Sequence, residues 1–343
     1  MKRLIPLSAS ALALALVTSC GSGGVTSAIG SDAYKVNTTT VSRSSFNDEL
    51  KQLSGNASFV ALLGSGTTPQ LVKGTAANTI DAAFARQELG FDIIFELIHE
   101  EVTAKGIKVD PTVNAEALTQ VKSRFGGDTI WNAFSAAFQK RSQDQIAELL
   151  QLRLSYVGQT QINDTVLKAA YDKDPTVFST KCYSHILVKT KAEADAIEAQ
   201  LTAGGDFATI AKAKSTDTTS GANGGDLTSG TCQTKTEIDG AGYVKEFSTA
   251  VDAAKLAVPT APFQSQFGFH IVLITKAAQP TWDTIKTQIK SYILGSSLPQ
   301  FQAWQKAAYA KAAIKVDPRY GAWDPTTTTV IALPANKADV AVN

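Results

Sequence analysis

The chain has 343 residues and is 44% hydrophobic, which is enough for two compact units with apolar cores. Its 32 lysines and arginines are balanced by 31 aspartates and glutamates. This near-neutral balance gives no sign of the basic surface that nucleic-acid-binding proteins need, so we expect no nucleic acid partner.

The N-terminus has the pattern of a cleaved export signal. A short basic segment precedes an apolar run at 4–17, which is too short for a comfortable membrane span. The stretch LVTSC, ending at Cys20, resembles a bacterial lipobox, in which the cysteine is lipidated after cleavage. We expect a signal peptide at 1–19 and a lipidated Gly/Ser-rich tether at 20–32, which places the protein on the outer face of a bacterial plasma membrane. The alternative is ordinary signal cleavage with an incidental cysteine.

Two further cysteines, Cys182 and Cys232, remain once Cys20 is assigned to a lipid. In an exported protein such a residual pair is a candidate disulfide. Closing a loop of about 50 residues would contribute roughly 4 kcal/mol in the loop-entropy model. The alternative is two free, buried thiols.

Residues 33–170 are expected to form a helical domain. After a short strand and a turn, two stripes of apolar residues recur at helical spacing, which indicates helices that pack on a core. The segment 171–180 is charged and contains a proline, so we interpret it as a linker. The two stripes consist of Phe91, Ile94, Phe95, Ile98 and Val102, and of Ile146, Leu149, Leu150, Leu154 and Val157.

The pattern changes at residue 181, where strand-like and short helical stretches alternate up to residue 278 and predict a compact α/β unit. Helical periodicity returns at 279–325, a segment that cannot bury its apolar faces alone. We therefore expect a C-terminal helix that packs on the N-terminal domain, with the α/β unit inserted between the two halves of one helical module. The tail at 326–343 is Thr/Ala-rich and is expected to be disordered.

Two of the three histidines, His185 and His270, stand in matching Ile-rich strands, in YSHILV and GFHIVLI. Three interpretations are open. As isolated core residues, each would need a buried hydrogen-bond partner. As metal ligands they would need further donors, and the HxxxH, HExxH and CxxC patterns are absent from the sequence, so we expect no metal. As a pair on adjacent strands, they would form a small polar floor in an apolar pocket.

Five stretches in fixed order resemble the parvulin-type peptidyl-prolyl cis-trans isomerases: SHILV, GDFATIAKAKSTD, NGGDL, GYVKEFSTAV and FGFHIVLI. The resemblance implies an α+β fold at 181–278, with a four-stranded antiparallel sheet and helices. A lipobox, a helical segment, a parvulin domain and a C-terminal helix, in this order, resemble the extracytoplasmic foldase and chaperone lipoproteins. No cofactor is implied, and the Gly-rich stretches lack the lysine of a P-loop, so we expect no nucleotide partner.

The resemblance also implies the site residues. The catalytic set would be His185, His270, Asp217 at the family's aspartate-or-cysteine position, and Ser265 as a supporting hydroxyl. The chain departs from the family in an insertion at 228–241, which carries Cys232. The arginines that one branch of the family places after the first histidine strand to recognise phosphorylated Ser/Thr-Pro are absent here, so we expect no phosphate recognition. The proline pocket would be lined by Leu227, Tyr243 (usually methionine), Phe247 and Phe267.

These features predict a membrane-anchored isomerase and chaperone that acts on X–Pro bonds of unfolded, exported polypeptides. Rotation about such a bond is slow when unaided, and its catalysis needs no nucleophile or metal. The alternative is a non-catalytic holdase or assembly chaperone whose parvulin domain only binds. A solute-binding lipoprotein would need a second α/β lobe, which the sequence does not indicate. The sequence leaves the clients and the oligomeric state open.

Overall fold

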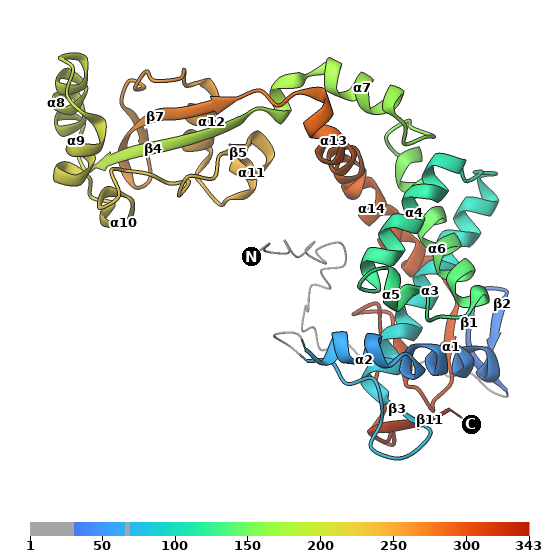
Figure 1. The fold of residues 1–343 in the computed structure, drawn as a ribbon. Helices are drawn as coiled ribbons and strands as arrows, with labels where there is room; N and C mark the ends of the chain where they lie inside the picture. Colours follow the sequence, from blue (N-terminus) through green and yellow to red (C-terminus); the bar gives the residue numbers. More distant parts are fainter. Residues whose placement is uncertain (1–30, 66–68, 343) are drawn as a thin grey trace. The chain divides into compact units, whose positions relative to one another are not determined.

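The computed structural model describes residues 31–65 and 69–342 (Figure 1). The chain divides into two compact units. Unit 1 is formed by Met1–Ile162 and Leu294–Asn343, and unit 2 is formed by Asn163–Ile293. The expected signal peptide, Cys20 and nearly all of the tether lie outside the described residues. In the part of the chain that is described, no helix has the length and apolar character to cross a membrane.

Unit 1 is mainly helical with short strands. Most of its helices begin at a Ser, Asn or Asp whose side chain accepts a hydrogen bond from the first turn, which satisfies an otherwise unpaired N–H. Its elements are β1 (Asp32–Val36), β2 (Thr39–Ser42), α1 (Arg43–Gly55), α2 (Ala57–Gly64), β3 (Thr79–Asp81), α3 (Ala82–Ala104), α4 (Pro111–Arg124), α5 (Asp128–Trp131), α6 (Ala136–Ser155), α14 (Leu298–Lys311), β8 (Ile314–Val316), β9 (Ala322–Asp324), β10 (Thr329–Ile331) and β11 (Asp339–Ala341).

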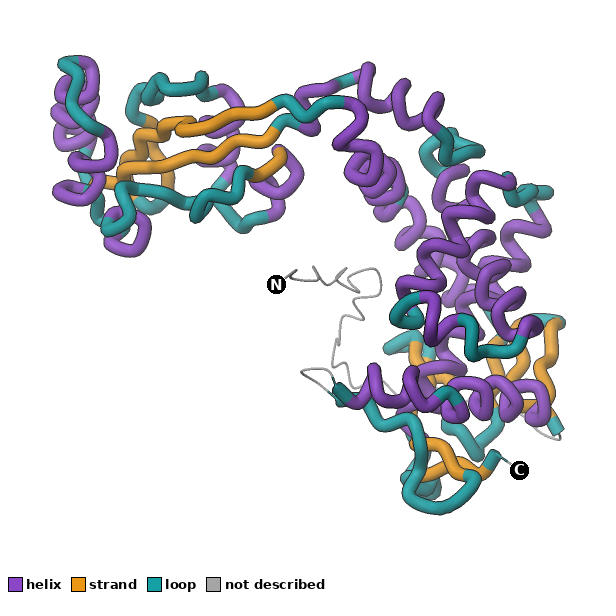
Figure 2. The backbone as a smooth tube through the Cα atoms, viewed as in Figure 1, coloured by secondary structure: helices purple, strands orange, loops and turns teal. Residues whose placement is uncertain are grey.

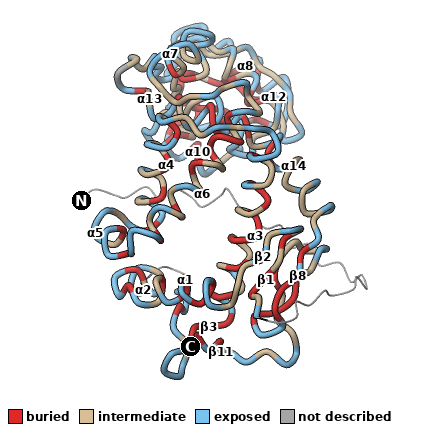
Figure 3. The backbone as a smooth tube through the Cα atoms, turned by 90° about the vertical axis from the view of Figure 1, so that its right-hand side faces the viewer, coloured by how far each residue is buried: buried red, intermediate tan, exposed pale blue. Residues whose placement is uncertain are grey.

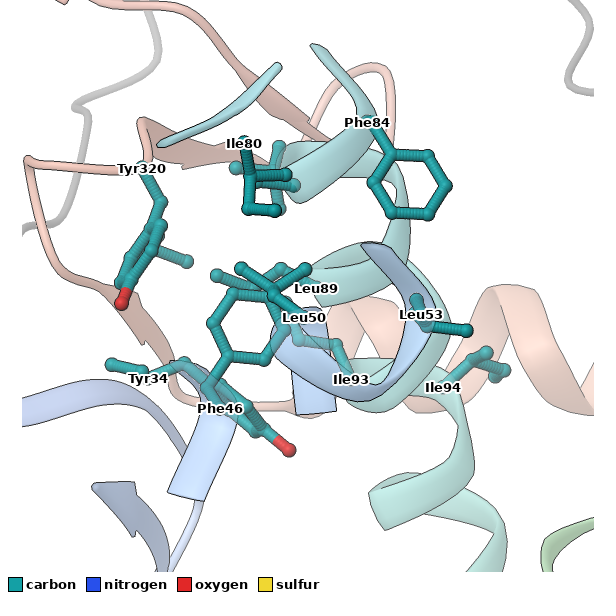
Figure 4. Close-up of a cluster of buried hydrophobic side chains, with 14 of the residues drawn as sticks. Tyr34, Phe46, Leu50, Leu53, Ile80, Phe84, Leu89, Ile93, Ile94 and Tyr320 are labelled. Carbon is teal, nitrogen blue, oxygen red and sulfur yellow. The ribbon is translucent and has the colours of Figure 1, made fainter. Parts of the chain in front are cut away.

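The core of unit 1 draws on both ends of the chain. Strand β1 pairs with β2 and with β8, and β3 pairs with β11. The side chains of Phe46 and Leu50 from α1 meet Leu89 and Ile93 from α3, and Tyr320 closes the cluster from the C-terminal segment (Figure 4). Buried positions of α3 and β1 are coloured red in Figure 3. The N-terminal and C-terminal segments therefore form a single core.

The prediction of a disordered tail at 326–343 is wrong. Strands β10 and β11 lie in this segment, and β11 pairs with β3. Val340 and Val342 are buried against the core of unit 1. A few well-spaced valines in a Thr/Ala-rich segment are enough to order it once a strand edge is available. The expected C-terminal helix at 279–325 is likewise two helices followed by short strands.

The expected linker at 171–180 is also ordered. It contains the end of α7 (Asp164–Lys173) and a 3₁₀ turn, η1 (Pro175–Phe178). Aromatic rings explain the order, because Tyr171 contacts Phe178 and Trp282, and Phe178 contacts Tyr292. Helix α7 and the first part of α13 (Trp282–Ser296) accordingly belong to unit 2, so its boundaries are wider than 181–278.

The centre of unit 2 is a four-stranded antiparallel sheet of order β5-β4-β7-β6, as predicted for the parvulin-like fold. Strands β4 and β7 run side by side in its middle (Figure 2). The elements are β4 (Thr180–Val188), α8 (Lys191–Thr202), α9 (Phe207–Lys214), α10 (Thr218–Gly221), β5 (Gln233–Thr234), α11 (Lys235–Gly240), α12 (Lys245–Ala253), β6 (Phe263–Ser265) and β7 (Gly268–Ala278).

The two faces of this sheet carry separate apolar clusters. Alternate residues of a strand point to opposite faces. Ile186, Val188 and Ile271 pack against α8 and α9 on one face. On the other face, Tyr183 and Val272 pack against α11 and α12. The second face is the one that carries the histidines.

Candidate active site

The register of β4 and β7 brings the two strand histidines together. His185 lies opposite Val272, and Leu187 lies opposite His270, so both imidazoles project from the same face two positions apart. Their ring centroids are 5.7 Å apart, with 28° between the planes. Both side chains are buried, with 6% of His185 and 4% of His270 exposed. Of the three interpretations of these histidines, the structure therefore has the pair on adjacent strands.

Asp217 reaches His185 because the segment that follows α9 is hydrogen-bonded to the end of β4. The Thr216 N–H donates to the Leu187 carbonyl over 2.7 Å, and Asp217 then begins the short helix α10. Its Oδ2 lies 2.8 Å from His185 Nε2. The Ser220 hydroxyl donates to the same oxygen over 2.6 Å and also lies 3.0 Å from His185 Nε2. One carboxylate oxygen thus holds both partners.

The ionised carboxylate of Asp217 fixes the tautomer of His185. Burial alone would raise the pKa of this carboxyl, but hydrogen bonds from Ser220 and His185 outweigh burial and lower the pKa to about 2. An ionised carboxylate can only accept hydrogen bonds, so His185 donates to it through Nε2–H. When the ring is neutral, Nδ1 of His185 therefore carries a lone pair.

His270 is held from the turn between β6 and β7. The Ser265 Oγ lies 2.7 Å from His270 Nε2, and the Phe267 backbone N–H donates to the same hydroxyl over 3.0 Å. Burial and the neighbouring His185 lower the pKa of His270 to about 4, so its imidazole is neutral at pH 7. Nδ1 of each histidine is buried and has no hydrogen-bond partner within the described residues. A buried unpaired polar atom costs about 1–3 kcal/mol, a cost that a bound ligand can relieve.

Close backbone contact supports the first histidine from behind. The His185 N–H donates to the Gly225 carbonyl over 2.9 Å. Gly225 has a φ of +84°, and a Cβ at this position would lie 2.3 Å from the His185 carbonyl oxygen. The second glycine of NGGDL is therefore required both by its conformation and by its proximity to β4.

Aromatic rings line the space above the histidines. The ring centroid of Phe247, from α12, lies 5.6 Å from that of His185 and 5.7 Å from that of His270. Phe263 stacks on His270 at 5.3 Å, and Tyr243 lies 4.8 Å from Phe247. Leu227 packs on the same cluster. The result is a packed apolar cluster that surrounds the two imidazoles.

A disulfide holds the insertion beside the first histidine strand. Cys182 and Cys232 are joined, and the residues after Cys232 form β5, which pairs with the start of β4. The hydroxyl of the fully buried Tyr183 donates to Gln233 of β5. The Tyr183 ring in turn contacts Tyr243 and Phe247, so the insertion helps to hold the aromatic cluster in place.

The structure brings together every predicted site residue of unit 2 except the Phe267 side chain. That side chain is 63% exposed and makes no ring contact within the described residues, although its N–H holds Ser265. Sequence reasoning missed Ser220 and Phe263. The pattern Asp-x-x-Ser at 217–220 is a helix-start signal that indicates Ser220, whereas only the β6–β7 register reveals Phe263. The described residues contain no cluster of three or more potential metal ligands.

Comparison with known proteins identifies the class of the domain in unit 2. Residues 185–276 match the family described as "Rotamase: PPIC-type PPIASE domain". The expectation of a parvulin-type peptidyl-prolyl cis-trans isomerase domain is confirmed. The foldase protein PrsA of Exiguobacterium sibiricum is 30% identical over 240 residues, which cover 66% of this chain and 75% of that protein. The chain belongs to the PrsA foldase family.

Other relatives match over a smaller share. The foldase protein PrsA of Clostridium kluyveri is 38% identical over 149 residues, and the chain spans 41% of its length. The counterpart from Caldanaerobacter subterraneus is 33% identical, with 49% of its length spanned. A crystal structure of the peptidylprolyl isomerase PrsA from Bacillus cereus matches with a TM-score of 0.35 and 24% identity, covering 82% of this chain and 93% of that one.

Proposed function

We propose that the protein is a lipid-anchored, extracytoplasmic foldase that isomerises X–Pro bonds in exported polypeptides. The observation that carries this proposal is the buried pair of His185 and His270 under the Phe247 ring. The membership in the PrsA foldase family supports it. The partners would be unfolded or newly exported chains, and the lipid on Cys20 would hold the protein at the membrane.

The pocket suits the physical problem of amide rotation. Resonance sets a barrier of about 18–20 kcal/mol, and the twisted amide at the top of this barrier has lost that resonance and its charge separation. A dry pocket lined by Phe247, Leu227 and the Tyr243 ring would seat the proline ring and favour the less charge-separated twisted form. Catalysis of this kind breaks no covalent bond and transfers no proton.

The histidines would act by orientation and polarity. Asp217 fixes His185 as an Nε2–H donor, and Ser265 holds the neutral His270. Each ring thereby presents a buried, unpaired Nδ1 atom. We assign Asp217, Ser220 and Ser265 as positioning residues and assign the two histidines to the wall that contacts the peptide.

Unit 1 would hold client chains through apolar surface. Leu62 and Leu71 are 41% and 70% exposed there, and they are among the few large hydrophobic side chains that face solvent in the described chain. A foldase would combine this holding role with isomerisation. In the alternative, a holdase, the parvulin domain would bind X–Pro segments without turnover.

A proline-limited refolding assay separates the two functions. We expect the wild-type protein to accelerate refolding and the double variant His185→Ala/His270→Ala to lose this acceleration. His99→Ala is a matched control, because His99 is an exposed histidine of α3 that pairs with Glu148. Equal acceleration by the wild type and the double variant would refute the isomerase function and leave the holdase. For the anchor, a Cys20→Ser variant should move from the membrane fraction to the medium.

A further inference from the structure

Unit 2 has a concave site beside the histidine pair. A groove of about 710 Å³ runs between α12 and the segment that leads into β6, the edge strand of the sheet. Its volume is within the range of about 300–1,000 Å³ that is usual for ligand sites. The walls are made by short side chains of α12, among them Thr249, Ala250 and Ala253, and on the opposite side by Val258 and Phe263.

The groove adjoins the histidine pair through one shared side chain. Phe263 lines the groove and also stacks on His270, with 15° between the two rings. Helix α12 is shared as well, because Phe247 on its buried face contacts both histidines while Thr249 and Ala253 line the groove. A client chain whose X–Pro bond lies at the histidine pair would therefore reach the groove past Phe263.

The surface chemistry of the groove fits an extended polypeptide. Val258 is 53% exposed, and Leu256, two residues earlier, has the same exposure, so apolar surface faces solvent here. Lys245, Glu246 and Lys255 stand among the lining residues, and none of these three forms an ion pair within the described part of the chain. Apolar walls with unpaired charges of both signs suit a peptide that has apolar side chains and polar main-chain groups.

We propose that this groove binds the residues of an extended client polypeptide that flank the isomerised proline. The proposal rests on the isomerase function and adds a subsite to it. Short alanine and threonine side chains on α12 leave room for client side chains of different shapes, whereas a groove for one fixed partner would be filled by larger complementary residues. Binding of the flanking residues would hold the X–Pro bond in the pocket and lower KM for long substrates more than for short ones.

The test compares a tetrapeptide and a dodecapeptide that share one Ala–Pro bond, using the whole chain. Ala253→Trp fills the groove from an exposed position of α12. We expect it to lower kcat/KM for the dodecapeptide by about tenfold, which corresponds to about 1.4 kcal/mol of lost apolar contact, and to leave tetrapeptide turnover unchanged. Ala199→Trp, at an exposed position of α8, is the matched control and should change neither value.

A second variant guards against misfolding. Thr249→Arg blocks the same groove from another exposed position and should repeat the selective loss on the dodecapeptide. If both groove variants treat the two peptides alike, the proposal is overturned. It is also overturned if these variants change only the oligomeric mass, because the groove would then join two copies of the chain.

Failure of the isomerase function has a different signature. In that case the wild-type protein turns over neither peptide, and fluorescence anisotropy of the labelled dodecapeptide measures the groove directly. An approximately tenfold weaker Kd in Ala253→Trp than in the wild type supports the groove even then. Equal Kd values in both proteins overturn it.

Discussion

Removal of the Cys182–Cys232 disulfide is expected to destabilise unit 2 by about 4 kcal/mol. The two cysteines are 50 residues apart. In the loop-entropy model a closed loop of about this length removes roughly 14 cal/mol/K from the unfolded chain, which is about 4 kcal/mol at 25 °C. This is a large share of the roughly 5–15 kcal/mol that stabilises a typical domain. The double variant Cys182→Ala/Cys232→Ala should therefore unfold at a clearly lower urea concentration.

The assay follows urea unfolding by circular dichroism and, in parallel, by loss of X–Pro turnover, which reports on unit 2. Reduced wild-type protein should match the double variant, and dithiothreitol should have no effect on the variant itself. We also expect a higher KM in the variant, because the insertion supports the Tyr183 ring under the pocket through Gln233. A destabilisation below about 1 kcal/mol, with unchanged KM, would show that the insertion is held without the disulfide and would refute this reasoning.

Three further predictions concern the pocket. Gly225→Ala should lower the free energy of unfolding by at least about 1 kcal/mol, because alanine is strained at positive φ. It should also reduce turnover by displacing His185, and an unchanged urea midpoint would contradict this prediction. Tyr243→Phe should keep KM for an X–Pro peptide within about twofold, whereas Tyr243→Ala should raise this KM about tenfold, because it is the ring of Tyr243 that packs on Phe247. Equal defects in the two variants would assign the role to the hydroxyl. Because the pKa of His270 falls from 6.5 to about 4 on folding, its contribution to stability is complete above pH 6.5 and is lost as the pH falls towards 4, with a loss of about 2 kcal/mol at pH 5. His270→Gln should remove this part of the pH dependence of urea unfolding, and identical pH profiles would exclude it.

The fold and most of the site of unit 2 were predictable because the residues that carry them are local and specific. Two histidines in strand contexts, the glycine pair at 224–225 and Asp217 ahead of a short helix each constrain the backbone within a few residues. Phe263 could not be assigned in this way. Its place on His270 depends on how β6 pairs with β7, and a shift of one residue would turn the ring to the other face.

The errors lie where order depends on distant partners. The segment 326–343 lacks strong periodicity, and its strand β11 is stabilised by β3, which lies more than 200 residues earlier in the sequence. The region 171–180 has charges and a proline, yet Tyr171 and Phe178 are ordered by rings that come after the sheet. Local composition cannot predict such contacts, because the residues that bury these segments lie far away in the sequence.

The pairing of β1 with β8 and of β3 with β11 has a consequence for how the protein is made. Unit 2 is one continuous segment, so all of its contacts are available as soon as residue 293 has been synthesised. Unit 1 cannot complete its strands until the last residues of the chain have arrived. Closing such long loops is slow, and until then the part of α3 that packs against β10 and β11 stays uncovered. We therefore expect unit 2 to acquire its structure first, so that each new molecule carries a folded isomerase domain while the remainder of its own chain is still unfinished.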